Sequence, residues 1–315
     1  MTAFDTTLGC FFIGIVLSTL FYGCTVAQVI YYARHYREDR WGFKTFVWLL
    51  WLLDTLVTIL DVALIWDFLI SGHANLLKLG TMPNSGVVEY LVVTIVTLTV
   101  QIYYTMTIWK LIKSKTYKIL ITSVVTVISL VSFAFGIENV YEVAHNPAIP
   151  AVYTMTVVPA TVQPVMACIA DIYITVALSW LLQRERTMFS HTDSLINTLT
   201  AWAINRGALT AAMQTAQAIT YIAADKDVFY WSIFHFAGGK AYVNSVLAIL
   251  NARHYIRSGG RSHGTDAFSV QEMPMHNVSA RKGLAERSWQ WPQWSQRSAN
   301  NGVMLETDVI RHFDK

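Results

Sequence analysis

Among the polar side chains that interrupt the long apolar stretches of this chain, five have types and spacings that could carry chemistry. Asp54 and Asp61 stand seven residues apart in one stretch, and Asp171 is in the middle of another. Lys240 and Asn244 are four residues apart in the last stretch. A charged side chain at the centre of a bilayer costs about 3 kcal/mol on insertion scales, so each needs a partner, a water cavity or a function.

Helical spacing brings these groups onto common faces. Seven residues return to within about 20° of the starting direction, so Asp54 and Asp61 share one helix face, about 10 Å apart. We expect Lys240 to meet at least one of Asp54, Asp61 and Asp171, directly or through water. Two interpretations stay open: an ion-pair network that only fixes helix register, and a ligand, ion or proton site built on the same residues.

Seven apolar stretches must position these side chains. A helix needs roughly 20 apolar residues to cross a hydrocarbon core of about 30 Å. A hydrophobic fraction of 54% with 14% charged residues is also too apolar for an ordinary soluble domain. We therefore predict an all-α polytopic membrane protein, a bundle of seven transmembrane helices. The predicted spans are 8–32, 46–70, 87–111, 119–136, 153–182, 199–223 and 228–250.

Basic residues fall on alternate loops and predict the orientation. Loops 33–45, 110–118, 183–198 and 251–262 carry 13 Lys or Arg, whereas the segments on the opposite side carry 2. Basic residues stay on the cytoplasmic side during insertion, so we expect the N-terminus outside and the C-terminus in the cytosol. Arg206 lies about two turns from the cytosolic end of its span, where its side chain could snorkel to the headgroups.

The chain divides into two parts by composition. Residues 1–256 form the predicted transmembrane domain, and 257–315 are polar, charged and aperiodic, which predicts a largely disordered cytosolic tail. Trp289, Trp291 and Trp294 interrupt this tail. They could dock on the inner leaflet or on a partner, or be chance aromatics in an unstructured segment.

Three segments carry a family resemblance, most specific within 171–253. They are Leu50-Trp-Leu-Leu-Asp-Thr-Leu56, Thr192 to Asn197 continuing to Asn205-Arg-Gly207, and Gly239-Lys-Ala-Tyr-Val-Asn-Ser245 continuing to Leu250-Asn-Ala-Arg253. Together they resemble a large family of uncharacterised seven-helix membrane proteins of mushroom-forming (basidiomycete) fungi, catalogued as a domain of unknown function. The resemblance spans about 8–256 and implies topology and membrane location, but no reaction. Arg206 departs from its pattern, where a small polar residue is expected.

Enzyme and cofactor signals are missing from the sequence. It has no HExxH motif, no glycine-rich phosphate loop and no clustered Cys and His ligands, so we expect no enzyme activity and no metal site. A retinal Schiff base on Lys240 would need a nearby carboxylate, yet Glu89, the acid of the third span, is near the outer end of that span. We therefore expect no cofactor and no nucleic-acid partner.

Three functional classes remain. A non-enzymatic receptor-like or ligand-sensing protein fits the topology, and Asp61 facing Asn244 could then form an ion site. The alternatives are a small-solute, ion or proton transporter that uses the buried Asp/Lys cluster, and a structural or assembly role. The expected partners are the lipid bilayer and a cytosolic protein bound through the inner loops and tail. The plasma membrane is the favoured location.

Overall fold

The structure is a computed structural model that describes residues 6–73, 75–184, 190–223 and 228–257. Within these ranges the regular structure is helical apart from one isolated antiparallel bridge between Thr81 and Ala148. A π-helical turn η1 (Asp67–Ser71) continues α3, and a short α4 (Leu76–Leu79) precedes α5. The long helices are α2 (Leu8–His35), α3 (Trp41–Trp66), α5 (Asn84–Leu111), α6 (Lys115–His145), α7 (Ile149–Arg184), α8 (Ser190–Ala223) and α9 (Tyr230–Arg257).

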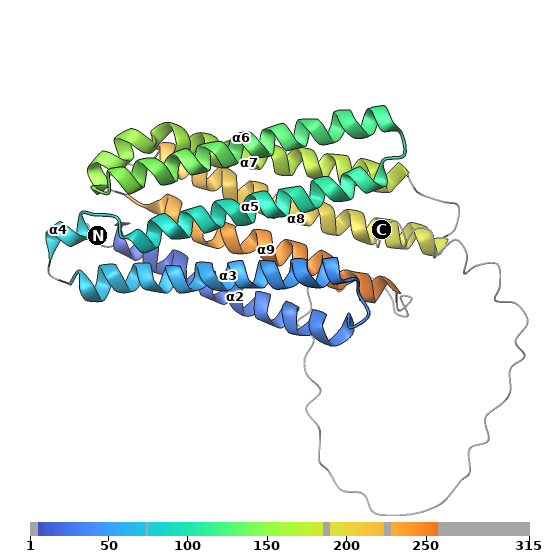
Figure 1. Ribbon diagram of the computed structural model, residues 1–315, viewed down its shortest axis with the longest axis horizontal. Helices are drawn as coiled ribbons and strands as arrows, with labels where there is room; N and C mark the ends of the chain where they lie inside the picture. Colours follow the sequence, from blue (N-terminus) through green and yellow to red (C-terminus); the bar gives the residue numbers. More distant parts are fainter. Residues whose placement is uncertain (1–5, 74, 185–189, 224–227, 258–315) are drawn as a thin grey trace, which may run out of the picture.

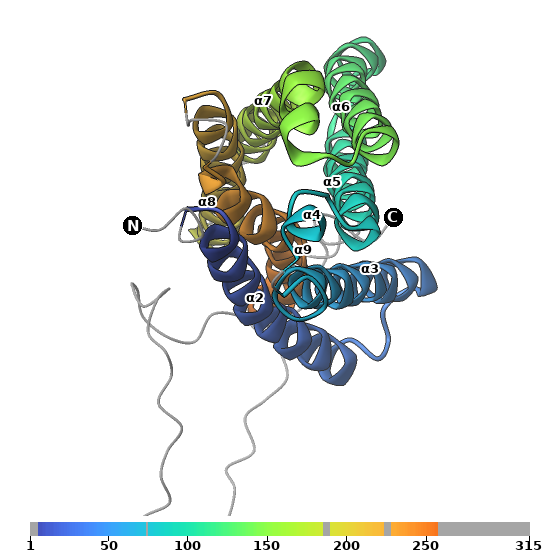
Figure 2. The same cartoon turned by 90° about the vertical axis from the view of Figure 1, so that its left-hand side faces the viewer.

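The long helices run antiparallel to their chain neighbours in one bundle (Figure 1). Each helix packs on the next in chain order, and α9 closes the ring by packing on α2. The last helix also contacts α3 and α5, so it lies further inside the bundle than its neighbours, as the view along the axis shows (Figure 2). We call the end where α2 begins the N-terminal end and the opposite end the basic end.

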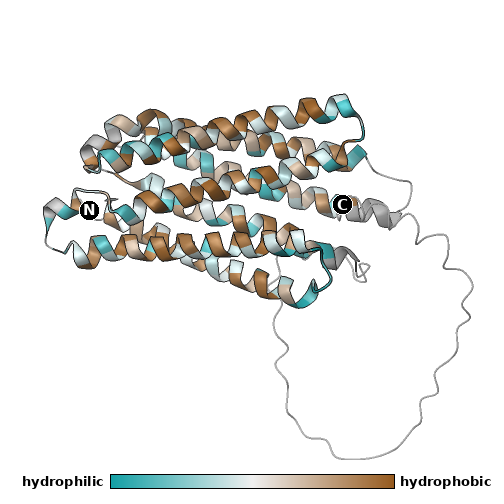
Figure 3. Cartoon of the chain, in the orientation of Figure 1, coloured by the Kyte–Doolittle hydropathy of each residue, from teal (hydrophilic) through white to brown (hydrophobic). Residues whose placement is uncertain are grey.

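Six of these helices are long and apolar enough to cross a membrane: α2, α3 with η1, α5, α6, α7 and α9. Apolar residues, coloured brown, recur along the length of these helices (Figure 3). Large apolar residues such as Leu20, Ile59 and Val127 are at least 60% exposed there, as lipid-facing residues are. The chain is therefore a multi-pass membrane protein. The seventh predicted span, α8, is long enough but less apolar over its described residues.

The helix bounds agree with the predicted spans and extend most of them by several residues. The fourth span continues to His145, and the fifth begins at Ile149, because a helix that leaves the hydrocarbon can go on in water. The fifth span passes through Pro159 and Pro164 without a break in the helix, so these prolines do not delay its start. The predicted tail, 257–315, including its three tryptophans, lies beyond the last described residue, Arg257.

Small residues let α7 and α8 approach closely. A side chain at Gly207 would overlap the Thr175 hydroxyl, and Cys168 Sγ lies 3.7 Å from the Ala211 carbonyl oxygen one turn further along α8. Gly207 and Ala211 belong to the four-residue repeat of small residues typical of close helix packing in membranes. The contact sets the depth at which α8 meets α7.

This contact makes a prediction for two glycine substitutions. Gly207→Ala should lower the free energy of unfolding by about 1–3 kcal/mol, because the new methyl group displaces Thr175 or separates α7 from α8. Gly238→Ala is the matched control: its Cβ would meet only Met213 Cβ at 3.6 Å, and alanine favours the helix by about 1 kcal/mol. Thermal unfolding in detergent, followed by exposure of the buried Cys10 thiol, measures both. Equal effects of the two substitutions would contradict the close contact.

Candidate functional site

Lys240 pairs with Asp54 in the middle of the bundle. Its ammonium Nζ is 3.1 Å from Asp54 Oδ1 and donates to the Asp54 carbonyl oxygen at 2.7 Å and to Thr58 Oγ1 at 2.6 Å. Lysine has three donors, so these three acceptors on α3 use its full capacity. Lys240 is fully buried and Asp54 is 1% exposed. The structure thus contains the expected contact between Lys240 and an acid, and it selects Asp54.

Asn244 serves a different contact from the one expected. Its amide nitrogen donates to the Phe21 carbonyl oxygen and to Thr25 Oγ1, both at 3.1 Å, and its Oδ1 accepts from Gln28 Nε2 at 3.1 Å. These partners all lie on α2. The structure therefore does not bring Asn244 to Asp61, and the ion site predicted between them is absent. Lys240 lies at the depth of Asp54, so Asn244 is one turn nearer the basic end, whereas Asp61 is about two turns nearer the N-terminal end.

Asp171 forms a second buried ion pair, with Arg206. Arg206 Nη2 donates to Asp171 Oδ1 at 2.9 Å, and Tyr242 OH donates to Asp171 Oδ2 at 2.6 Å. The guanidinium also stacks over Tyr104, with 4.0 Å from its carbon to the ring centre. Arg206 is 4% exposed, so the expectation that it snorkels to the headgroups is wrong. A buried carboxylate next to it makes the inward position more favourable than the headgroups.

Asp61 and a pair that the sequence did not suggest lie nearer the N-terminal end. Ser18 Oγ donates to Asp61 Oδ2 at 2.6 Å, and His235 Nε2 is 3.1 Å from Glu89 Oε2. Asp61 interacts electrostatically with Glu89 and His235. A lone histidine in an apolar helix is usually a packing residue, and Glu89 lies near the end of its span, so sequence spacing does not predict this pair.

The ion pairs follow α9 along its length. His235, Lys240 and Tyr242 contact α5, α3 and α7 in turn. The described residues contain no group of three or more Cys, His, Asp or Glu placed to hold a metal ion. The column is instead made of pairs. His235–Glu89 and Lys240–Asp54 join α9 to α5 and α3, and the Asp171–Arg206 pair joins α7 to α8 and accepts a hydrogen bond from Tyr242 on α9.

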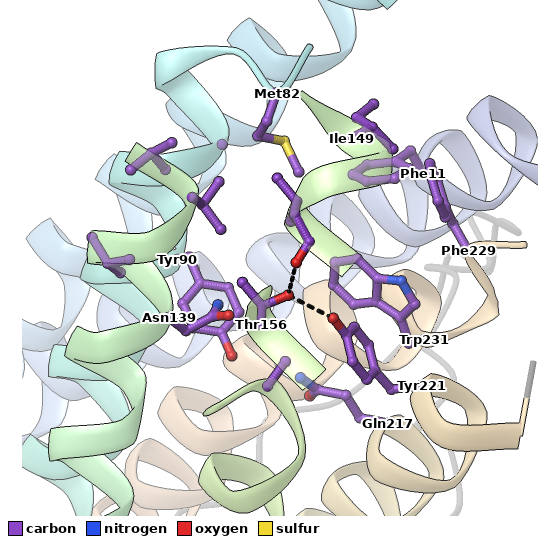
Figure 4. A pocket seen from close by; sticks show the side chains of 16 residues that line it. Phe11, Met82, Tyr90, Asn139, Ile149, Thr156, Gln217, Tyr221, Phe229 and Trp231 are labelled. Carbon is purple, nitrogen blue, oxygen red and sulfur yellow. Dashed lines mark hydrogen bonds between the residues drawn. The ribbon is translucent and has the colours of Figure 1, made fainter. Parts of the chain in front are cut away.

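A cavity of about 60 Å³ lies at the N-terminal end, beside this column (Figure 4). We call it the aromatic cavity. Its walls come from α2, α5, α6, α7, α8 and α9, and they include Tyr90, Asn139, Thr156, Tyr221 and Trp231. Neither Lys240 nor Asp171 lines it.

The cavity is roofed at one end and closed at the other by rings. Met82 and Ile149 line it, and the loops that carry them are joined by Met82 N–H to the Pro147 carbonyl at 2.7 Å and Ile149 N–H to the Gly80 carbonyl at 2.9 Å. At the inner end, Tyr90 stacks on the His235 ring with 4.8 Å between centres. Trp231 meets the same ring edge-on at 5.9 Å. The cavity walls therefore touch the His235–Glu89 pair.

The basic end is held by a clasp, which we define as Tyr32, Tyr36, Asp39, Asn251 and Arg253. Arg253 Nη2 donates to Asp39 Oδ2 at 2.7 Å, and Tyr32 OH donates to the same oxygen at 2.9 Å. Tyr36 OH donates to the Asn251 carbonyl at 2.8 Å. The clasp ties the end of α9 to α2 and the loop that follows it.

With the geometry established, the comparisons with known proteins can be stated. A protein-family model described as "Family of unknown function (DUF6534)" matches residues 167–255. Residues 167–255 are therefore similar to this family of unknown function. No curated protein and no solved structure matches it.

The matched segment runs from the second half of α7 to the last residues of α9. It contains Asp171, Arg206 and Lys240, and it leaves Asp54 and Asp61 on helices outside the match. This finding confirms the expected relation to a family of unknown function. The matched segment includes one complete ion pair, Asp171–Arg206, and the basic member of three others, His235, Lys240 and Arg253.

The Lys240–Asp54 pair makes the second prediction. Lys240→Met should lower the free energy of unfolding by about 3–5 kcal/mol, because it leaves the Asp54 carboxylate buried without its cation. The double variant Lys240→Met/Asp54→Asn should recover part of that loss, since it leaves no charge behind. Unfolding temperatures of the single and double variants in detergent complete the cycle. Strict additivity of the two changes would contradict a direct pair.

Proposed function

We propose that this protein is a non-enzymatic, receptor-like membrane protein of seven transmembrane helices that senses a small ligand in the aromatic cavity. The N-terminus faces outside and the basic end faces the cytosol in this proposal. The one-sided distribution of Lys and Arg supports that orientation. The plasma membrane is the favoured location, since the N-terminal end, where the cavity lies, then faces the cell exterior.

Two features support α8 as the seventh span despite its lower hydropathy. It has 34 residues, which at 1.5 Å per residue is about 50 Å, long enough to cross a bilayer. It also lies between α7 and α9 in the ring. Its polar groups turn inward, as Arg206 toward Asp171 and Gln214 toward Tyr242 show. A helix with this polar face needs less apolar surface because only one side meets lipid.

The contact between the cavity wall and the ion-pair column is the observation that carries the sensing proposal. Trp231 and Tyr90 line the cavity and pack against His235, which pairs with Glu89. A ligand that moves either ring changes the surroundings of this pair. Since His235 is on α9, the change passes to the helix that also carries Lys240 and Arg253.

The middle of α9 has a glycine pair that suits such a role. Gly238 and Gly239 lie between His235 and Lys240, and glycine-containing pairs are common points of helix bending. A Cβ at Gly238 would make only one ordinary contact, so packing does not require glycine there. Glycine at position 238 destabilises the helix by about 1 kcal/mol relative to alanine. In this proposal glycine is there because it lets α9 bend.

The other two functional classes receive less support. Transport through the Asp/Lys cluster needs access to Lys240, but its three donors are already bonded and the cavity stops at His235. A purely structural role accounts for the Lys240–Asp54 and Arg206–Asp171 pairs. It gives no reason for a cavity roofed by two hydrogen-bonded loops, whose lining contacts a third pair.

A cytosolic protein is the proposed partner that reads the basic end. In the clasp, the Arg253 side chain is 18% exposed. A partner at the basic end can therefore contact it and respond when its position changes. The inner loops and the tail are the proposed contact surface. The lipid bilayer is the other partner.

The test measures whether the two ends of the bundle are coupled, and it needs no ligand. Spin labels replace Trp41 and Tyr117, which are 83% and 59% exposed at the basic end, in a background without the native cysteines. Trp231→Ala removes a ring from His235 and should shift the label-to-label distance by about 1–2 Å, the size of helix shifts in switching proteins. Pulsed electron-electron double resonance in nanodiscs measures this distance.

Trp66→Ala is the matched control. Trp66 lies at the N-terminal end of the bundle, as Trp231 does, but its side chain is 57% exposed. The substitution should leave the distance unchanged. If Trp231→Ala and Trp66→Ala both give the wild-type distribution, the bundle is a static scaffold and the sensing proposal fails.

A further inference from the structure

The lining of the aromatic cavity restricts the charge of what can bind there. None of its 16 residues is Asp, Glu, Lys, Arg or His. The nearest ionisable pair, His235 with Glu89, is separated from the cavity by the Tyr90 and Trp231 rings. An ion entering the cavity would lose its hydration without gaining an opposite charge, which is strongly unfavourable. The occupant is therefore neutral.

Besides its hydroxyls, the cavity lining carries two side-chain amides, those of Asn139 and Gln217. The hydroxyls of Thr156 and Tyr221 are 2.8 Å apart, and Tyr90 OH donates to Gln163 Oε1 at 3.1 Å. Asn139 is 5% exposed, and its Oδ1 accepts no hydrogen bond from the described residues. A buried amide oxygen without a donor is unfavourable, so a ligand that donates to it binds more tightly than one that cannot.

The cavity volume sets the size of the occupant. One water needs about 10–15 Å³ of such volume, so 60 Å³ has room for about four to six non-hydrogen atoms. A cavity that binds benzene has about 150 Å³, more than twice the volume here, so an aromatic ring does not fit. A cluster of waters fits by volume, but each water needs two to four polar partners and this lining is mainly aliphatic and aromatic.

From these three restrictions we infer that the aromatic cavity binds a short-chain neutral alcohol of about four to six non-hydrogen atoms. Its hydroxyl bonds to the Asn139 amide, and its alkyl chain packs among Phe11, Tyr221 and Trp231. A hydroxyl both donates and accepts, so it suits either orientation of the amide. The inference rests on the sensing role proposed above and names its ligand class.

The test measures 1-propanol and 1-butanol binding to the full chain in nanodiscs by saturation-transfer difference NMR, with empty nanodiscs as the lipid blank. Wild type should give a saturable signal that weakens for 1-hexanol, because the longer chain exceeds the cavity. Diethyl ether has the same number of non-hydrogen atoms as 1-butanol but no donor. It should bind about tenfold more weakly, the size of one hydrogen bond.

Two variants locate the site. Asn139→Leu keeps the approximate shape and should weaken 1-butanol about tenfold while leaving diethyl ether unchanged. Ala160→Leu places new carbons in the cavity, because Ala160 lines it and is 7% exposed, and it should abolish binding of both. Ala134→Leu, on the exposed face of α6, is the matched control and should bind as wild type does.

Several outcomes would overturn the inference. They are signals that rise steadily with chain length as lipid partitioning does, wild-type binding by Ala160→Leu, or equal 1-butanol and ether affinities in wild type. If no alcohol binds but Trp231→Ala still shifts the basic end, the ligand class is wrong and the sensing role stands. If 1-butanol binds at Asn139 but leaves the label distance unchanged, and Trp231→Ala does too, the site stands and the sensing role fails.

Discussion

Lipid offers no hydrogen bonds, and this constraint organises the interior of the bundle around α9. An ammonium at the centre of the bilayer must find every acceptor within the protein. Lys240 finds three on one helix, α3, which fixes both the rotation and the depth of α9 against it. The remaining polar groups of α9 are then turned toward fixed neighbours. His235 meets α5, Tyr242 meets α7 and Asn244 meets α2.

The same constraint explains why α8 is less apolar than the other long helices. Its polar residues do not face lipid: Arg206 pairs with Asp171 on α7, and Gln214 donates to Tyr242 on α9 at 3.3 Å. Gly207 brings α8 close enough to α7 for the arginine to reach its carboxylate. The low hydropathy of α8 thus comes from polar residues that are buried between helices. Mean hydropathy alone therefore underestimates how well α8 suits a position in the bundle.

Sequence reasoning worked where one energetic term dominated. Apolar length predicted the helices, and the cost of an unpaired Lys240 predicted that it meets an acid. The partner could not be chosen, because Asp54 and Asp61 share a face and only the depth of α9 decides between them. The predictions for Asn244 and Arg206 were wrong for a related reason. Helical periodicity tells which face of a helix carries a residue, but not which neighbouring helix that face contacts. The aromatic cavity gave no signal at all, since its walls come from six helices.

The geometry of α9 also limits how the bundle can move. Its polar contacts reach α5, α3, α7 and α2 in turn, and its last turn is held by the Asp39–Arg253 pair. Buried contacts of this kind are made or broken, because an intermediate distance leaves a charge without a partner. A rigid displacement of the whole helix would therefore strain every pair at once. Bending at Gly238–Gly239 would instead separate the His235 half from the Lys240 half. In that case the pairs near the cavity could rearrange while Lys240 keeps its three acceptors on α3.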